Sequence, residues 1–75
     1  MWYYRLPKFE LSITAMNSNK FLLKINGFEC DTYTDPKIAA DNVFTQTTRY
    51  IPFDSCQEDA TVLAIPLDLS EWTKR

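Results

Sequence analysis

Apolar and polar residues alternate through residues 9–15 and again through residues 20–25, the two-residue period typical of a strand with one buried face. The apolar members are Phe9, Leu11, Ile13 and Ala15 in the first segment and Phe21, Leu23 and Ile25 in the second. A short link at residues 17–19 puts both sets on one face if Ala15 pairs with Phe21 and Ile13 with Leu23. The pattern therefore predicts two antiparallel strands that share a buried face.

The dipeptide Asn26-Gly27 follows directly and is the strongest turn signal in the chain. Both residues suit the positive φ angles of a type I′ turn, which predicts a second hairpin and fixes its register. The expected pairs are Ile25 with Phe28, Lys24 with Glu29, and Leu23 with Cys30. A fourth strand is expected in residues 2–6, so the start of the chain predicts an antiparallel meander.

The spacing of apolar residues changes to a helical period after residue 35. Thr34 or Asp35 can cap this helix, and Pro36 suits its first position. The stripe expected to face the sheet consists of Ala39, Ala40, Val43, Phe44 and Thr47. The positions expected to face water are Lys37, Asp41, Asn42 and Gln46, with Ile38 at the margin of the stripe.

The remainder of the chain gives weaker signals. Residues 49–60 predict a loop that carries buried aromatic side chains, and residues 61–65 predict a final strand that ends at Pro66. Asp68 with Glu71 resembles a capping box, which predicts a last turn that directs Trp72 back to the domain. The chain is thus expected to form one α+β domain over residues 1–75. Its antiparallel meander would have three to five strands, with one main helix packed on one face.

Both tryptophans lie near the ends of the chain, at positions 2 and 72. Two interpretations remain open: each ring pins a terminus over a small core, or each is an anchor for a partner. Large rings are efficient core residues in a short chain, because each can bury roughly 150–250 Å².

Composition narrows the class of protein. The 75 residues include two Trp, four Tyr and five Phe but one Gly, and the formal net charge is −2. So many aromatic residues argue against disorder. The lysines and arginines are dispersed, and a weak negative charge does not favour a general nucleic-acid binder.

Several catalytic chemistries lack their usual residues. The chain has no histidine, the commonest general base and metal ligand. One glycine cannot build a phosphate-binding loop, and a chain this short is expected to leave little room for a pocket of ~300 Å³ or more. We therefore expect no enzyme, no metal and no cofactor. Cys30 and Cys56 are expected to be free thiols, and the acidic residues Asp54, Glu58 and Asp59 a solvated loop.

The start of the chain has no apolar segment typical of a signal peptide, and no apolar run is long enough to cross a bilayer. A cytoplasmic protein with no membrane contact is expected.

Surface recognition is the function that these absences favour. The outer face of the predicted sheet would carry Glu10, Ser12, Thr14, Leu22, Lys24, Glu29, Asp31 and Tyr33. The candidate partner-binding residues are Tyr3, Leu22, Tyr33, Tyr50, Phe53 and Trp72, because Tyr and Trp are enriched at interface hot spots. The alternative is a nucleic-acid-binding accessory domain that stacks bases on the aromatic residues 2–4 beside Arg5.

Three stretches, "DPKIAADNVFTQTT", "PFD" and "IPLDLSEW", carry a resemblance. In this order they resemble the C-terminal half of a group of small proteins from bacterial and phage genomes. That group has an "AAD–V" helix and a closing "P-x-D-L-S-E-W". Phe53 stands where the group has tryptophan. The resemblance implies no activity and no site residues.

The function expected from these observations is a small non-enzymatic protein-binding module or regulator with an unidentified protein partner. Its sharpest form is a phage-encoded inhibitor of a host defence complex, similar to anti-CRISPR proteins. The chain is expected to be a monomer or a weak homodimer, since a free edge strand permits pairing.

Overall fold

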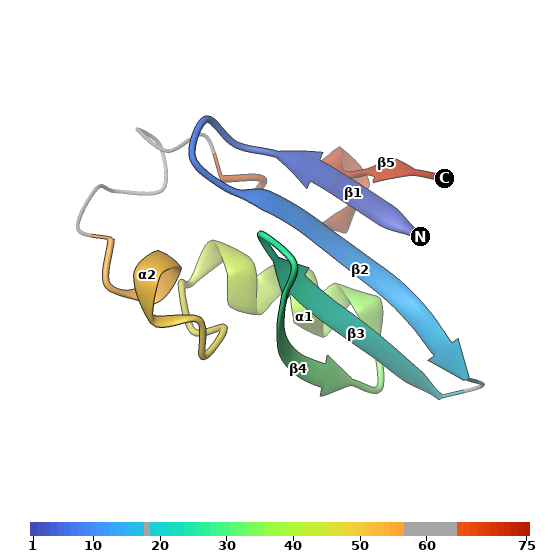
Figure 1. Cartoon of the computed structure of the whole chain (residues 1–75). Coiled ribbons are helices and arrows are strands. Elements are labelled where there is room, and N and C mark those ends of the chain that lie inside the picture. Colours follow the sequence, from blue (N-terminus) through green and yellow to red (C-terminus); the bar gives the residue numbers. More distant parts are fainter. Residues whose placement is uncertain (18, 57–64) are drawn as a thin grey trace.

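A computed structural model describes residues 1–17, 19–56 and 65–75 of the chain (Figure 1). The strands are β1 (Trp2–Arg5), β2 (Glu10–Asn17), β3 (Lys20–Ile25), β4 (Phe28–Tyr33) and β5 (Thr73–Lys74). The helices are α1 (Pro36–Phe44), α2 (Ile51–Asp54) and a 3-10 turn, η1 (Leu69–Glu71). All strand pairs are antiparallel in the order β4-β3-β2-β1-β5, which confirms the predicted meander and the α+β class.

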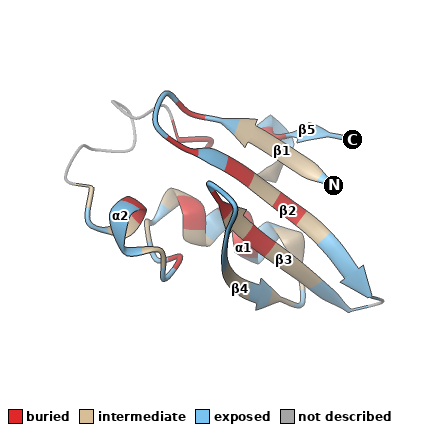
Figure 2. Cartoon of the chain, in the orientation of Figure 1, coloured by how far each residue is buried: buried red, intermediate tan, exposed pale blue. Residues whose placement is uncertain are grey.

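The core lies between the sheet and α1, which packs on one face of it (Figures 1 and 2). The fully buried side chains of this layer are Leu11, Ile13, Leu23 and Ile25 from the sheet and Ala39, Ala40 and Val43 from α1. The predicted pairs Ala15–Phe21 and Ile13–Leu23 are both formed, so the alternating pattern fixed the buried face correctly. In the part of the chain that the structure describes, no helix is long and apolar enough to cross a membrane.

Helix α1 begins as the sequence predicts. The Asp35 side chain accepts a hydrogen bond from the backbone N–H of Lys37 at 2.8 Å, and Pro36 occupies the first turn. The helix ends earlier than expected, at Phe44, because Gln46 adopts a left-handed conformation with φ of 56°. Thr47 is consequently exposed and does not join the buried stripe.

Two residues expected to face water are half-buried and hydrogen-bonded. Asn42 Nδ2 donates to the hydroxyl of Tyr33 at 3.1 Å, and Gln46 Nε2 donates to the carbonyl of Phe53 at 3.0 Å. Polar side chains that become half-buried are usually paired with acceptors on neighbouring segments, because an unpaired buried polar group is unfavourable. The helical period alone did not indicate these partners.

The second hairpin contains a β-bulge that the sequence did not reveal. Ile25–Phe28 and Lys24–Glu29 pair as predicted, but Leu23 lies opposite Asp31 and not Cys30. The extra residue shifts the rest of β4 by one position, which reverses the faces of its side chains. Asp31 and Tyr33, expected on the outer face, therefore lie on the side of α1, where Tyr33 packs against the core.

The Asp31 side chain, next to the bulge, occupies one backbone N–H of the edge strand β4. Asp31 Oδ1 accepts a hydrogen bond from the backbone N–H of Thr32 at 2.8 Å, and Asp31 Oδ2 lies 3.3 Å from Arg49 Nε. An occupied N–H and a charged side chain hinder the pairing of another strand at this position of the edge.

The C-terminal segment turns back on the domain as predicted. Asp68 caps η1 by accepting from the N–H of Ser70, while Glu71 Oε2 accepts from the N–H of Leu67 at 2.6 Å. Beyond this turn, β5 pairs with β1 in the register Trp2–Lys74 and Tyr3–Thr73, a strand that the sequence did not predict. The strand expected over residues 61–65 lies outside the described residues, except for Ile65, which is buried.

The two tryptophans differ in burial. Trp72 is 5% exposed and lies 6.1 Å from the ring of Tyr4. Trp2 is half-buried, with its ring 6.0 Å from Phe21 and the Lys74 ammonium 4.9 Å above it. These positions favour the interpretation that the rings pin the chain ends, most clearly for Trp72.

Candidate functional site

The six residues expected to bind a partner do not form one surface. Phe53 is fully buried and Trp72 nearly so, which places both in the core and not on the surface. Tyr33 is half-buried beside α1, and burial raises the pKa of its phenol. Because of the bulge in β4, Tyr33 lies on the inner face of the sheet and not on the outer face where it was expected.

Tyr3 and Leu22 do lie on the outer face of the sheet. The Tyr3 hydroxyl donates to Glu10 Oε1 at 2.8 Å, which raises the pKa of the phenol, and the Arg75 guanidinium lies 4.9 Å from its ring. Leu22 is half-buried among polar neighbours. The outer face of the sheet is therefore mainly polar, and its candidate binding residues Tyr3 and Leu22 are both half-buried.

Tyr50 belongs to a separate and more apolar surface. Its ring lies 5.0 Å from the ring of Phe28, and the next residue is Ile51. Phe28 is 50% exposed and Ile51 is 68% exposed, the highest value among the large apolar residues that the structure describes. We call Phe28, Tyr50 and Ile51 the Tyr50 patch.

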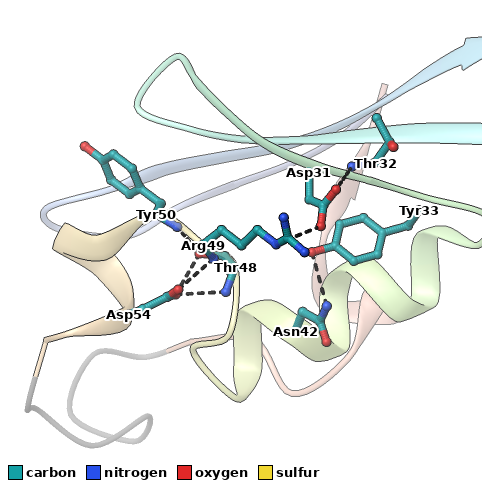
Figure 3. A network of polar contacts seen from close by, with 8 residues as sticks. All are labelled: Asp31, Thr32, Tyr33, Asn42, Thr48, Arg49, Tyr50 and Asp54. Atoms are coloured by element: carbon teal, nitrogen blue, oxygen red, sulfur yellow. Dashed lines mark hydrogen bonds and ion pairs between the residues drawn. The ribbon is translucent and has the colours of Figure 1, made fainter.

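A polar network holds the backbone that presents this patch (Figure 3). The Asp54 carboxylate accepts three hydrogen bonds, from Thr48 N at 2.9 Å, Thr48 Oγ1 at 2.7 Å and Arg49 N at 2.7 Å. Thr48 is the fully buried polar residue of the described chain, and its Oγ1 also accepts from the N–H of Tyr50. Charge-assisted bonds of this kind are stronger than neutral ones, so Asp54 acts as a clamp on residues 48–50.

Two residues that precede Tyr50 have backbone angles that residues other than glycine rarely adopt. The φ angles of Gln46 and Arg49 are 56° and 75°, in the left-handed region. Such angles persist where surrounding contacts determine the backbone. Gln46 Nε2 supplies such contacts by donating to the carbonyls of Phe53 and Cys56, at 3.0 and 3.1 Å.

Phe53 anchors the segment 46–54 to the core of the domain. It is the third residue of α2, and its ring packs edge-on against Phe9 at 5.0 Å. The short helix thus has one residue in the core while Ile51, at its first position, points to solvent. Phe53 ties the segment 46–54 to the core, whereas the bonds of Gln46 and Asp54 brace the segment itself. Arg49 and Ile51 are exposed, and Tyr50 between them is half-buried against the core.

The sequence missed Phe28 and Ile51 as surface residues. Phe28 was expected only as the partner of Ile25, and Ile51 only as part of a loop. A usable signal existed in the dipeptide Ile51-Pro52, since proline suits the first turn of a helix, where apolar residues are not necessarily buried.

The structure offers little for metal or thiol chemistry in its described part. Asp54 is engaged with Thr48 and Arg49, the other two members of the expected acidic loop lie outside the described residues, and no described group of three candidate ligands lies together. Both cysteines are free thiols, as predicted. Burial raises the pKa of Cys30 to about 11, so this thiol is protonated at neutral pH.

A hollow of about 390 Å³ lies between α1 and residues 67–70, and is larger than we expected of so short a chain. Its charged lining groups are Lys37, Asp41 and Asp68. Hydrogen bonds from Ser70 lower the pKa of Asp68, so its carboxylate stays ionised at neutral pH. In this hollow the Ser70 hydroxyl donates to Asp68 Oδ1, and a carboxylate with a lowered pKa is a weak base for activating a hydroxyl.

The aromatic residues of β1 do not form one stacking platform. Trp2 and Tyr4 pair with Ile13 and Leu11 and share their buried face, whereas Tyr3 pairs with Ser12 on the opposite face. Strand geometry separates successive side chains in this way.

Comparison of the chain with known proteins gave no match to a family model, to a curated protein or to a solved structure.

Proposed function

We propose that this chain is a small protein-binding module that regulates a larger protein by occupying part of its surface. The observation that carries the proposal is the Tyr50 patch: the most exposed apolar side chain of the described chain, Ile51, stands on a backbone fixed by Asp54 and Phe53. A side chain presented on a fixed backbone loses little conformational entropy on binding, which raises affinity.

The patch has the composition of an interface centre. Tyrosine is enriched at hot spots, and an exposed aliphatic residue beside stacked rings can enter a pocket of a partner. Three residues cover a small area, so Ile51 would serve as an anchor within a larger contact. Inhibition of a host defence complex by a phage-encoded protein is the most specific form of the proposal. The chain's small size and its weak negative charge support that form.

Replacing Ile51 with aspartate tests the proposal. The affinity-tagged chain and its variants would be incubated with a lysate of the source organism or its host, and the captured proteins quantified by mass spectrometry. A partner specific to the wild-type chain should fall at least about tenfold with Ile51→Asp, because a carboxylate in an apolar pocket is not solvated.

Leu67→Asp is the matched control, since Leu67 is 61% exposed at another site. It should retain the partner, and both variants should melt close to the wild-type temperature because neither residue is buried. Equal capture by the wild-type chain and Ile51→Asp would refute the role of the patch. Equal loss with both variants would indicate nonspecific apolar adhesion.

A further inference from the structure

Arg49 combines three features that its structural role does not explain. Its backbone is left-handed, with φ of 75°. Its side chain is 77% exposed, and its Nε lies 3.3 Å from Asp31 Oδ2 (Figure 3). It also directly precedes Tyr50, a member of the Tyr50 patch.

Stability does not account for an arginine at this position. An exposed ion pair contributes little to stability, whereas a left-handed φ is unfavourable for any residue with a Cβ atom. Glycine would adopt the same backbone without strain and would keep the N–H that donates to Asp54. The stability that the contact with Asp31 contributes is therefore smaller than the cost of placing a residue with a Cβ atom at this backbone angle.

The guanidinium is also positioned to bind something else. Its Nε lies beside Asp31 Oδ2, and the side chain is 77% exposed, so its guanidinium is accessible to solvent. Arginine presents its donors in a planar fork that matches a carboxylate in two parallel hydrogen bonds. A carboxylate from a partner would complete this fork on its solvent side.

We propose that Arg49 determines specificity by binding a carboxylate of the partner protein, next to the apolar contact of the Tyr50 patch. This inference rests on the proposed function. Phe28, which packs on Tyr50, and Asp31, which holds Arg49, are three positions apart on β4. The bulge puts both residues on the same face of the sheet, so the apolar and acidic groups of the partner would lie side by side.

A carboxylate fits this surface better than a nucleic-acid phosphate. Binding to nucleic acid needs several basic residues along a backbone, but Arg49 is the one basic residue of the network in Figure 3. The apolar neighbours Ile51 and Phe28 also suit a protein surface rather than a phosphate chain.

Selection from a library of random constrained peptides displayed on phage tests the inference without knowledge of the natural partner. The baits are the wild-type chain, Ile51→Asp, Arg49→Gly, Arg49→Lys and, as a control on β1, Arg5→Ala. Peptides selected by the wild type over Ile51→Asp should be enriched in Asp or Glu near an aliphatic or aromatic residue. A synthetic peptide of this class should bind Arg49→Gly about ten- to a hundredfold more weakly. Arg49→Lys should lose part of the affinity and Arg5→Ala almost none, while Arg49→Gly should melt at or above the wild-type temperature.

The outcomes distinguish a failure of the role of Arg49 from a failure of the Tyr50 patch as a binding surface. Acid-rich peptides that bind Arg49→Gly as tightly as the wild type would overturn the role of Arg49 and leave the patch intact. If the wild type selects no peptides over Ile51→Asp, the proposed function fails at this surface, and the inference fails with it. A fluorescent single-stranded oligonucleotide that binds the wild type but not Arg49→Gly would overturn the inference in favour of a phosphate ligand.

Discussion

Replacing Phe53 with alanine is expected to lower the free energy of unfolding by about 3–5 kcal/mol, as for other large-to-small changes of aromatic core residues. Phe53 is fully buried against Phe9, and it joins α2 to the core. A domain of this size has a total stability of roughly 4–11 kcal/mol, so the variant should be partly unfolded at 37 °C. Urea denaturation followed by tryptophan fluorescence measures the change.

Phe53→Leu is the control for this prediction, because it keeps most of the buried volume and should cost clearly less. Ile51→Ala, two positions earlier and exposed, should change stability by less than about 0.5 kcal/mol. Equal effects of Phe53→Ala and Ile51→Ala would mean that α2 does not pack on the core as described.

Trp72→Ala is expected to cost about 3–4 kcal/mol. The ring is 5% exposed and packs against Tyr4, and it holds the turn of η1 against the sheet where β5 pairs with β1. Thermal unfolding monitored by far-ultraviolet circular dichroism should show a large decrease in melting temperature, on the order of 10 °C or more for a domain this small.

Trp72→Phe separates packing from hydrogen bonding. The indole Nε1 of Trp72 is buried without a hydrogen-bond partner among the described residues, and an unpaired buried donor is unfavourable. Phenylalanine removes this donor and keeps most of the apolar area, so Trp72→Phe should be far less destabilised than Trp72→Ala. If Trp72→Ala instead keeps its melting temperature and loses a partner, Trp72 is an interface anchor.

Local patterns in the sequence predicted most of the sheet. The alternation in β2 and β3 and the Asn26-Gly27 turn each act over a few residues, and both determine register directly. The β4 bulge was not predictable in the same way, because no residue type requires it. One inserted position then reversed the expected faces of Asp31 and Tyr33.

The segment 46–54 escaped prediction for a different physical reason. Its structure depends on a carboxylate that accepts bonds from residues five and six positions earlier, and on a glutamine side chain that binds carbonyls seven and ten positions later. Neither interaction has a period or a turn signal. Strand β5 was missed similarly, since its two residues, Thr73 and Lys74, are too few to show alternation.

The candidate site shows what residue type alone can indicate. Aromatic residues were selected because they are common at interfaces, but Phe53 and Trp72 are equally suited to a core, and the structure buries both. Tyr50 stayed half-exposed, with its ring against the exposed Phe28 and with the exposed Ile51 next to it in the chain. Which aromatic residues are exposed in a small domain depends on the tertiary structure.

The proposed function requires residues 48–51 to be held in one conformation before any partner binds. Hydrogen exchange of the free protein, followed by NMR, tests this most directly at the amides of Thr48 and Arg49, which donate to Asp54. Both amides should exchange at least about a hundredfold more slowly than in an unstructured peptide. In Asp54→Ala this protection should disappear while the amides of β2 and β3 stay protected. Unprotected amides of Thr48 and Arg49 in the wild-type chain would show that Asp54 does not hold this segment before a partner binds.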